Sequence, residues 1–262
     1  MVDLLKAEYI KLTSTRSPWW CTAFFIVLGL GITLLSVSAV RSSLRQHETS
    51  PATVNAELAV IGIAGGFSAI YLVMVLATLT ATSEYRSGVI RTTFLACSSR
   101  SLVLTAKAVL TGVAMMIIAF LIGIFAFMLV KGMLGGEGGV KLEFSGETWS
   151  YLIGAALFTF LCAVLAVGVG ALLRHSAGAI SLLLLWPLVA ETILGRIGNF
   201  GRNVTPLLPF ANANHFFGAE SDITGGGRVQ WHWGPWGGLA YFAVFVAVVF
   251  GAALVVVNQR DA

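Results

Sequence analysis

The chain is organised around residues 84–107, with the sequence EYRSGVIRTTFLACSSRSLVLTAK. This stretch separates two runs, residues 58–82 and 108–130, that contain no charged side chain. Its five charged residues are Glu84, Arg86, Arg91, Arg100 and Lys107. Because such side chains are expensive to bury in hydrocarbon, the stretch is predicted to project from a membrane as a polar loop. The apolar residues of its middle, around Phe94, predict a short amphipathic helix within that loop.

The composition supports a membrane location. Of 262 residues, 57% are hydrophobic and only 11% are charged, whereas a soluble domain has roughly 25% charged residues. A soluble fold of this size could not hide so much apolar surface. The chain is therefore predicted to be an all-α integral membrane protein. Its net charge of +4 is interpreted as a signal of orientation in the membrane and not of nucleic-acid binding.

Six runs predict membrane-spanning helices, because each is near the roughly 20 residues needed to cross. They cover residues 19–40, 58–82, 108–130, 148–173, 176–195 and 236–257. The fifth reaches this length only by continuing through Glu191, and Pro187 predicts a kink in it. Residues 1–18 place Val2, Leu5 and Tyr9 at helical spacing, which predicts an interfacial connecting helix that ends at Pro18.

The placement of Lys and Arg predicts the topology. With the N-terminus in the cytoplasm, the inner segments 1–18, 83–107, 174–175 and 258–262 carry nine basic residues in 50, and the outer segments carry seven in 79. The denser side is expected to be cytoplasmic. Both termini and the 83–107 loop are therefore predicted inside. The outer segment 191–235 is unusually apolar and is predicted to re-enter the outer leaflet as short helices, with Trp231, Trp233 and Trp236 at the interface.

Catalytic and metal motifs are missing from the sequence. It contains no phosphate-binding GxxxxGK[ST], no HExxH and no GxSxG, and its three cysteines have no metal or disulfide spacing. The four histidines are scattered over different segments, so we expect no metal site and no catalytic residue. Glu191 is the one carboxylate near a spanning run, which makes it a candidate gating or substrate contact. The alternative interpretation is a carboxylate at the water interface, paired with Arg196.

The ordered pattern resembles the ABC-2 type permeases, the membrane subunits of bacterial ATP-binding cassette exporters. Glu84, Gly88, the apolar turn before Phe94, Arg100 and Lys107 follow that family's first cytoplasmic loop, with Cys97 where the family usually has proline. The opening LLKAEYIKL resembles its connecting helix, and the final Arg-Asp-Ala resembles its common terminus. The 191–235 segment corresponds in position to its outer re-entrant element.

The resemblance implies a function. The 83–107 loop would couple the permease to a separate pair of ATPase subunits, through Glu84, Arg86, Gly88, Arg91, Phe94, Arg100 and Lys107. A second permease copy, or a related permease, would complete the substrate pathway. ATP and Mg²⁺ would bind the partner ATPase, with no cofactor on this chain.

Two other functions stay open at this point. The first is a non-transporting anchor or regulator that binds a soluble partner through 83–107. The second is a membrane-embedded lipid enzyme, for which a polar cluster around Glu191 and Arg196 offers the candidate groups. For a transporter, the apolar helix interiors favour a hydrophobic or amphipathic cargo such as a drug, a peptide or a lipid-like molecule.

Overall fold

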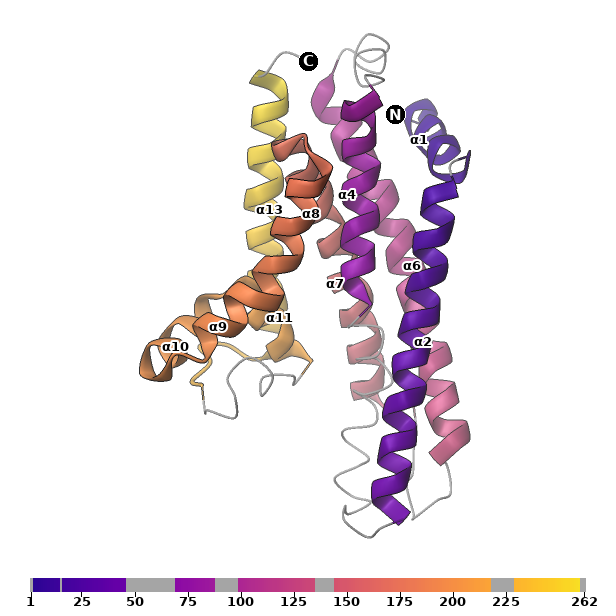
Figure 1. The fold of residues 1–262 in the computed structure, drawn as a ribbon, viewed down its shortest axis with the longest axis vertical. Helices are drawn as coiled ribbons and strands as arrows, with labels where there is room; N and C mark the ends of the chain where they lie inside the picture. The colour runs from indigo at the N-terminus through magenta and orange to yellow at the C-terminus, as the bar shows by residue number, and fades with distance from the viewer. Residues whose placement is uncertain are drawn as a thin grey trace.

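The computed structural model describes residues 2–14, 16–45, 69–87, 99–134, 144–217 and 229–259. Every regular element within these ranges is a helix (Figure 1). Five helical stretches are long and apolar enough to cross a membrane: Pro18–Ser42, Arg100–Leu134, Thr148–Leu173, Ser176–Gly195 and Pro235–Gln259. The prediction of an all-helical, membrane-embedded chain is therefore confirmed. Of the run predicted at 58–82, the described part belongs to the apolar helix α4 (Ile70–Ser87), and residues 58–68 lie outside the described ranges.

The N-terminal helix is shorter than predicted. Helix α1 (Val2–Ser14) ends before Pro18, and helix α2 (Arg16–Arg45) contains this proline in its first turn. Proline is tolerated there because the first N–H groups of a helix have no partner within the helix. The prediction that Pro18 ends the connecting helix is wrong for that reason. Pro18 instead begins the first spanning helix, and that helix exposes Trp19, Trp20 and Leu35.

The polar loop is also shorter than predicted at both ends. Helix α4 continues to Ser87, and helix α6 (Arg100–Leu134) begins eight residues before the predicted start at residue 108. Glu84 and Lys107 are therefore helical residues and not loop residues. The length of an uncharged run is shorter than the helix itself when charged residues near the helix end are paired inside the protein. The segment that joins α4 to α6 between the described ranges is residues 88–98.

Helix α7 (Gly146–Leu173) lies at the centre of the bundle and packs against α4, α6, α8 and α13. Within its most apolar stretch 67% of the residues are buried, against 22–28% for the other four candidate spans. The side chain of Ser145 caps its first turn by accepting a hydrogen bond from the backbone N–H of Thr148 at 3.3 Å. Because a much smaller share of the outer helices is buried, these helices present apolar faces to their surroundings, as expected for contact with lipid.

The fifth predicted span is a continuous but irregular helix. It consists of α8 (Ser176–Leu185), a π-helical stretch η1 (Trp186–Glu191) and α9 (Thr192–Gly195). Pro187 lies at the start of η1, where its missing N–H interrupts the α-helical hydrogen bonds. A π-helical segment therefore lies where the kink at Pro187 is predicted, and such segments are one of the recognised causes of helix bending.

The segment after α9 forms short helices. These are α10 (Gly198–Val204), the 3₁₀ turn η2 (Thr205–Leu207) and α11 (Pro209–Phe216), followed by the last spanning helix α13 (Pro235–Gln259). Figure 1 shows α9 and α10 leading away from the bundle, and α11 returning to lie against α13. Short helices in the 191–217 part are as predicted, and residues 218–228 lie outside the described ranges. Re-entry into a leaflet stays a prediction.

One end of the bundle gathers several helix ends. Figure 1 places α1, the last turn of α4, the first turn of α6 and the last turn of α13 at the same end. The helices α9, α10 and α11 lie away from that end. The arrangement positions the ends of α4 and α6, with the charged residues quoted above, next to the N-terminal helix.

A close helix contact gives a first prediction. A methyl group added at Gly154 of α7 would overlap the ring of Phe216 in α11. That ring is buried against Tyr151, Phe217 and Trp236, so it has no room to move. We expect Gly154→Ala to destabilise the protein by about 1–3 kcal/mol, the usual cost of overpacking.

The matched control is Gly31→Ala in α2, where an added methyl group meets nothing within 4 Å. This change should be neutral or stabilise by about 0.5–1 kcal/mol, because alanine favours a helix interior. Thermal unfolding of both variants in detergent measures the difference. Equal unfolding temperatures for the two would contradict the packing of α11 on α7.

Candidate functional site

The N-terminal helix contributes two charged residues to the site. Glu8 and Lys11 lie three positions apart in α1, so they share one side of the helix. Their side chains form an ion pair, with Lys11 Nζ 2.9 Å from Glu8 Oε1. Helix α1 packs against α6 and α2, which turns this polar side toward the bundle.

Two further charges come from the helices on either side of the 88–98 segment. Glu84 lies in the last turn of α4, and Lys107 lies two turns into α6. Lys107 Nζ is 2.9 Å from Glu84 Oε1. The sequence singled out both residues, and the structure brings them together from positions 23 residues apart in the chain.

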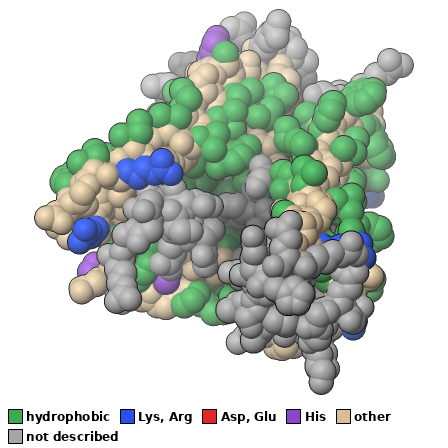
Figure 2. Space-filling view, turned by 60° about the horizontal axis from the view of Figure 1, so that its bottom comes forward, with side chains coloured by type: hydrophobic (Ala, Val, Ile, Leu, Met, Phe, Trp, Pro, Cys, Tyr) green, Lys and Arg blue, Asp and Glu red, His purple; other side chains and the backbone are tan. Residues whose placement is uncertain are grey.

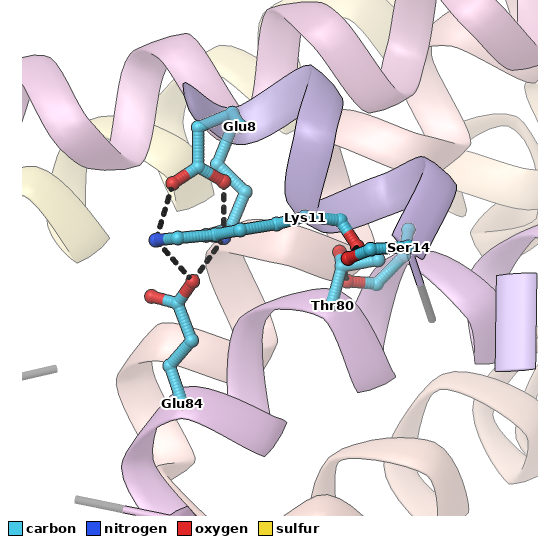
Figure 3. A network of polar contacts seen from close by, with 7 residues as sticks. Glu8, Lys11, Ser14, Thr80 and Glu84 are labelled. Carbon is cyan, nitrogen blue, oxygen red and sulfur yellow. Dashed lines mark hydrogen bonds and ion pairs between the residues drawn. The ribbon is translucent and has the colours of Figure 1, made fainter. Parts of the chain in front are cut away.

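The four side chains close into a ring, which we call the ion-pair ring: Glu8, Lys11, Glu84 and Lys107. Figure 3 shows Glu8, Lys11 and Glu84 directed toward one another. Lys107 Nζ is also 2.6 Å from Glu8 Oε2, and Lys11 Nζ is 3.0 Å from Glu84 Oε1. Each carboxylate therefore lies between two ammonium groups, and each ammonium lies between two carboxylates. The ring is formally neutral and joins α1, α4 and α6.

Three members of the ring are deeply buried. Glu8 is 2% exposed, Lys107 6% and Glu84 7%, whereas the side chain of Lys11 is 38% exposed. Transfer of a charge out of water costs several kcal/mol, and this cost is offset only when the partner is close and well oriented. Removal of one buried member would leave an uncompensated charge, so the ring fixes the relative positions of three helices.

The pKa values of the α1 residues reflect this environment. Burial pushes the pKa of Glu8 upward. The positive charges and hydrogen bonds of Lys107 and then Lys11 lower it by more, so the pKa lies below the ordinary value of 4.5. Burial pushes the pKa of Lys11 downward, but hydrogen bonds to Glu8 and Glu84 outweigh it, and the pKa lies above the ordinary 10.5. Both shifts favour the charged forms, so the α1 side of the ring stays ionised over the whole neutral range.

These directions predict a pH profile. The stabilisation from Glu8 is fully present above its unfolded pKa and is lost as the pH falls through its lower folded value. The stabilisation from Lys11 is fully present below its unfolded pKa and is lost as the pH rises through its higher folded value. We expect the unfolding temperature of wild-type protein minus that of Glu8→Gln to be constant between about pH 6 and 9 and to shrink in acid. A difference that grows on acidification would contradict the assignment.

A second contact lies beside the ring. The guanidinium carbon of Arg174 lies 5.3 Å from the ring centroid of Tyr85, the residue after Glu84. Arg174 ends helix α7 in the left-handed conformation, with φ at 53°, which is uncommon for a residue other than glycine. A cation over an aromatic face is attracted to it, so this contact ties the α7–α8 turn to the end of α4.

The other residues predicted to contact an ATPase are placed only in part. Arg100 is the first residue of α6 and is half-buried. Arg86 lies in the last turn of α4, but its side chain is outside the described part of the structure. Gly88, Arg91 and Phe94 lie outside the described residues. The role of these five residues in coupling stays a prediction, and Glu84 and Lys107 are directed inward to the ring.

Sequence reasoning missed Glu8 and Lys11 as site residues. An interfacial helix is expected to turn its charged side chains toward water, yet Glu8 is almost completely buried. A usable signal was present: a Glu and a Lys three residues apart in a chain with only 11% charged residues. In such a chain, a charged pair on a helix beside the membrane is expected to meet other charges.

Glu191 occupies a different environment from the water interface. It is completely buried and accepts hydrogen bonds from the backbone N–H groups of Phe210 at 3.1 Å and Ala211 at 2.7 Å. The indole Nε1 of Trp186 donates a third, at 2.9 Å. The interfacial interpretation is therefore wrong, because the first turn of α11 covers this carboxylate. Glu191 caps α11 and joins it to η1.

An apolar pocket adjoins this cap. It has a volume of about 320 Å³ and lies among α7, α8 and α13. Trp186 and Phe210 line it together with aliphatic side chains such as Leu182 and Val249. Two residues bonded to Glu191 thus form part of the pocket wall. Among the described residues, no group of three His, Cys, Asp or Glu side chains is placed to hold a metal ion.

No protein-family model and no curated protein matches the chain.

Proposed function

We propose that the chain is the membrane-spanning permease subunit of an ATP-driven exporter of the ABC-2 type, in the cell membrane of a bacterium. It crosses the membrane six times, with both termini and the 83–107 region in the cytoplasm. It carries no catalytic residue and no cofactor, and it pairs with a second permease copy and with a pair of ATPase subunits. The ATPase subunits bind ATP and Mg²⁺. The cargo is hydrophobic or amphipathic.

The observation that carries this proposal is the ion-pair ring. A permease must convert motion of an ATPase into motion of its own helices, so the contact segment has to be attached rigidly. The 88–98 segment begins four residues after Glu84, and α6, which follows it, begins seven residues before Lys107. Because the ring binds these two helix ends to each other and to α1, a force on the segment moves three helices as one unit.

The ends of the chain support the same topology. Helix α1, the last turn of α4, the first turn of α6 and the last turn of α13 share one end of the bundle (Figure 1), as an even number of crossings requires. An ATPase that docks at this end contacts Arg91 and Phe94 on the segment, with Arg86 and Arg100 at its two borders. Basic side chains at such a border are suited to acidic partner surfaces.

The apolar pocket supports the proposal that the cargo is hydrophobic or amphipathic. Its walls are hydrocarbon and aromatic side chains, and such walls favour the burial of an apolar group over that of a solvated ion. The pocket lies between spanning helices and touches Trp186 and Phe210, which hold the cap at Glu191. Entry of a hydrophobic group there would act on the α11 element.

Affinity purification of the tagged chain from its native membrane in mild detergent tests the function. An ATPase should co-purify in stoichiometric amount, and the complex should hydrolyse ATP. The variant Arg91→Glu should lose the ATPase by charge repulsion while the chain itself is recovered in normal yield. The matched control is Lys131→Glu, the same charge reversal in α6 at the opposite end of the helix.

The outcomes separate the candidate functions. An ATPase that is lost with Arg91→Glu but kept with Lys131→Glu supports the proposal. A soluble partner without ATPase activity would favour an anchor or regulator instead. A chain that purifies alone in several detergents would contradict the proposal.

A further inference from the structure

A polar pocket of about 720 Å³ lies beside the short helix α10. The lining side chains are Asn199, Arg202, Asn203, Pro206, Gln230 and His232. They come from two separate parts of the chain: α10 with the turn η2 after it, and the stretch just before α13. The pocket is independent of the ion-pair ring and of the apolar pocket.

The lining has the chemistry of an anion site. Arg202 supplies a permanent positive charge and a planar set of N–H donors. Three amide side chains add further donors, and His232 adds a ring N–H. No carboxylate is among the described residues that line the pocket. An arginine surrounded by neutral donors is suited to a phosphate group, whose oxygens accept several hydrogen bonds at once.

The two walls are held in fixed positions by contacts behind them. Trp233 donates from Nε1 to Asn212 Oδ1 at 2.7 Å, and the Trp231 ring stacks on His215 at 4.2 Å between centroids. These contacts fasten the wall that carries Gln230 and His232 to helix α11. The amide of Asn212 also donates to the carbonyl oxygens of Pro206 and Leu208, at 2.9 and 2.8 Å. The pocket is therefore formed before any ligand binds.

The position of the pocket relates it to the membrane surface. Asn199 comes four residues after the candidate span Ser176–Gly195, and His232 comes three residues before the span Pro235–Gln259. Both walls thus stand where the chain leaves the apolar spans. Exposed apolar side chains lie on the same short helices, with Phe200 and Leu207 each 56% exposed. Figure 2 shows basic side chains on this arm next to apolar ones.

We propose that this pocket binds the phosphate of an anionic phospholipid headgroup, in the leaflet at this end of the protein. Arg202 pairs with the phosphate, and the amides of Asn199, Asn203 and Gln230 complete its hydrogen bonds. The acyl chains lie along the exposed apolar side of α10 and η2, at Phe200 and Leu207. A headgroup held there fixes the arm that α9 and α10 form beside the bundle.

Native mass spectrometry of the full chain, titrated with phosphatidylglycerol or phosphatidylcholine, tests the proposal. Phosphatidylglycerol should be retained more tightly than the zwitterionic lipid. Arg202→Gln should weaken its retention by about tenfold, the loss expected for a charge-assisted hydrogen bond. Arg196→Gln is the matched control, since Arg196 is an exposed arginine of the same arm that does not line the pocket. Its effect should stay within about twofold.

A competition arm distinguishes the source of the phosphate. Inorganic phosphate and soluble glycerol phosphate, at millimolar concentration, should leave the bound lipid in place because they lack acyl chains. Full displacement by either anion would overturn the lipid assignment and indicate a site for soluble phosphate compounds. Equal retention of lipid by Arg202→Gln and Arg196→Gln, with both variants folded as judged by thermal unfolding, would overturn the proposal as a whole.

Discussion

Lys107→Met is expected to destabilise the protein by about 3–5 kcal/mol, because it removes one partner from a buried ion pair. The change removes the ammonium group that lies 2.6 Å from Glu8 Oε2 and 2.9 Å from Glu84 Oε1. Methionine fills a similar volume but supplies no charge. Thermal or denaturant unfolding in detergent, with circular dichroism as the readout, measures the loss. Lys11→Met should cost much less, about 1 kcal/mol or below, because Lys11 is partly exposed to solvent.

A second substitution tests whether the ring acts as a unit. Adding Glu8→Gln to Lys107→Met removes one carboxylate and leaves the neutral pair Lys11–Glu84. The double variant should therefore recover part of the stability that Lys107→Met loses. Such coupling is expected for residues in one ion-pair network. If the destabilisation of the double variant equals the sum of the destabilisations measured for Lys107→Met and Glu8→Gln alone, the two residues do not share the ring.

Glu191→Ala is expected to cost about 3–5 kcal/mol, because it leaves three buried donors without their acceptor. These donors are the indole N–H of Trp186 and the backbone N–H groups of Phe210 and Ala211. The loss also removes the cap of α11. Glu191→Gln should have a smaller effect, since its amide oxygen can still accept one or two of these bonds.

Hydrogen exchange at α11 reports this loss directly. In Glu191→Ala the amides of Phe210 and Ala211 should exchange on the order of 100-fold faster, the equivalent of about 3 kcal/mol. The three described hydrogen bonds to Glu191 come from Trp186, Phe210 and Ala211, so the amides in the middle of α7 serve as the internal reference. Unchanged exchange at both α11 amides would mean that Glu191 does not cap the helix.

The spanning helices were predictable because their signal is local. An uncharged run of about 20 residues needs a helix to satisfy its backbone in hydrocarbon, and five of the predicted runs are found as such helices. Their ends were less predictable. Helix α6 extends back to Arg100 because Lys107 is neutralised by Glu8, a residue 99 positions away in the chain. Counting charges along the sequence cannot detect such a partner.

The two candidate sites show the same limit. The sequence singled out Glu84 and Lys107 for a surface contact, but their inward pairing depends on how α1 docks. Glu191 was singled out as the one carboxylate near a spanning run. Its burial depends on backbone N–H groups 19 and 20 residues later, and every residue type except proline supplies such a group. No residue pattern marks that contact in advance.

The central claim is that an ATPase docks on the segment between α4 and α6, and photo-crosslinking tests it most directly. A photoreactive phenylalanine analogue replaces Phe94 in intact membranes, and in a control it replaces Leu35, which is 71% exposed on α2. We predict an adduct with an ATPase subunit from position 94 and none from position 35. A correctly inserted chain that gives no ATPase adduct from position 94 would contradict the account.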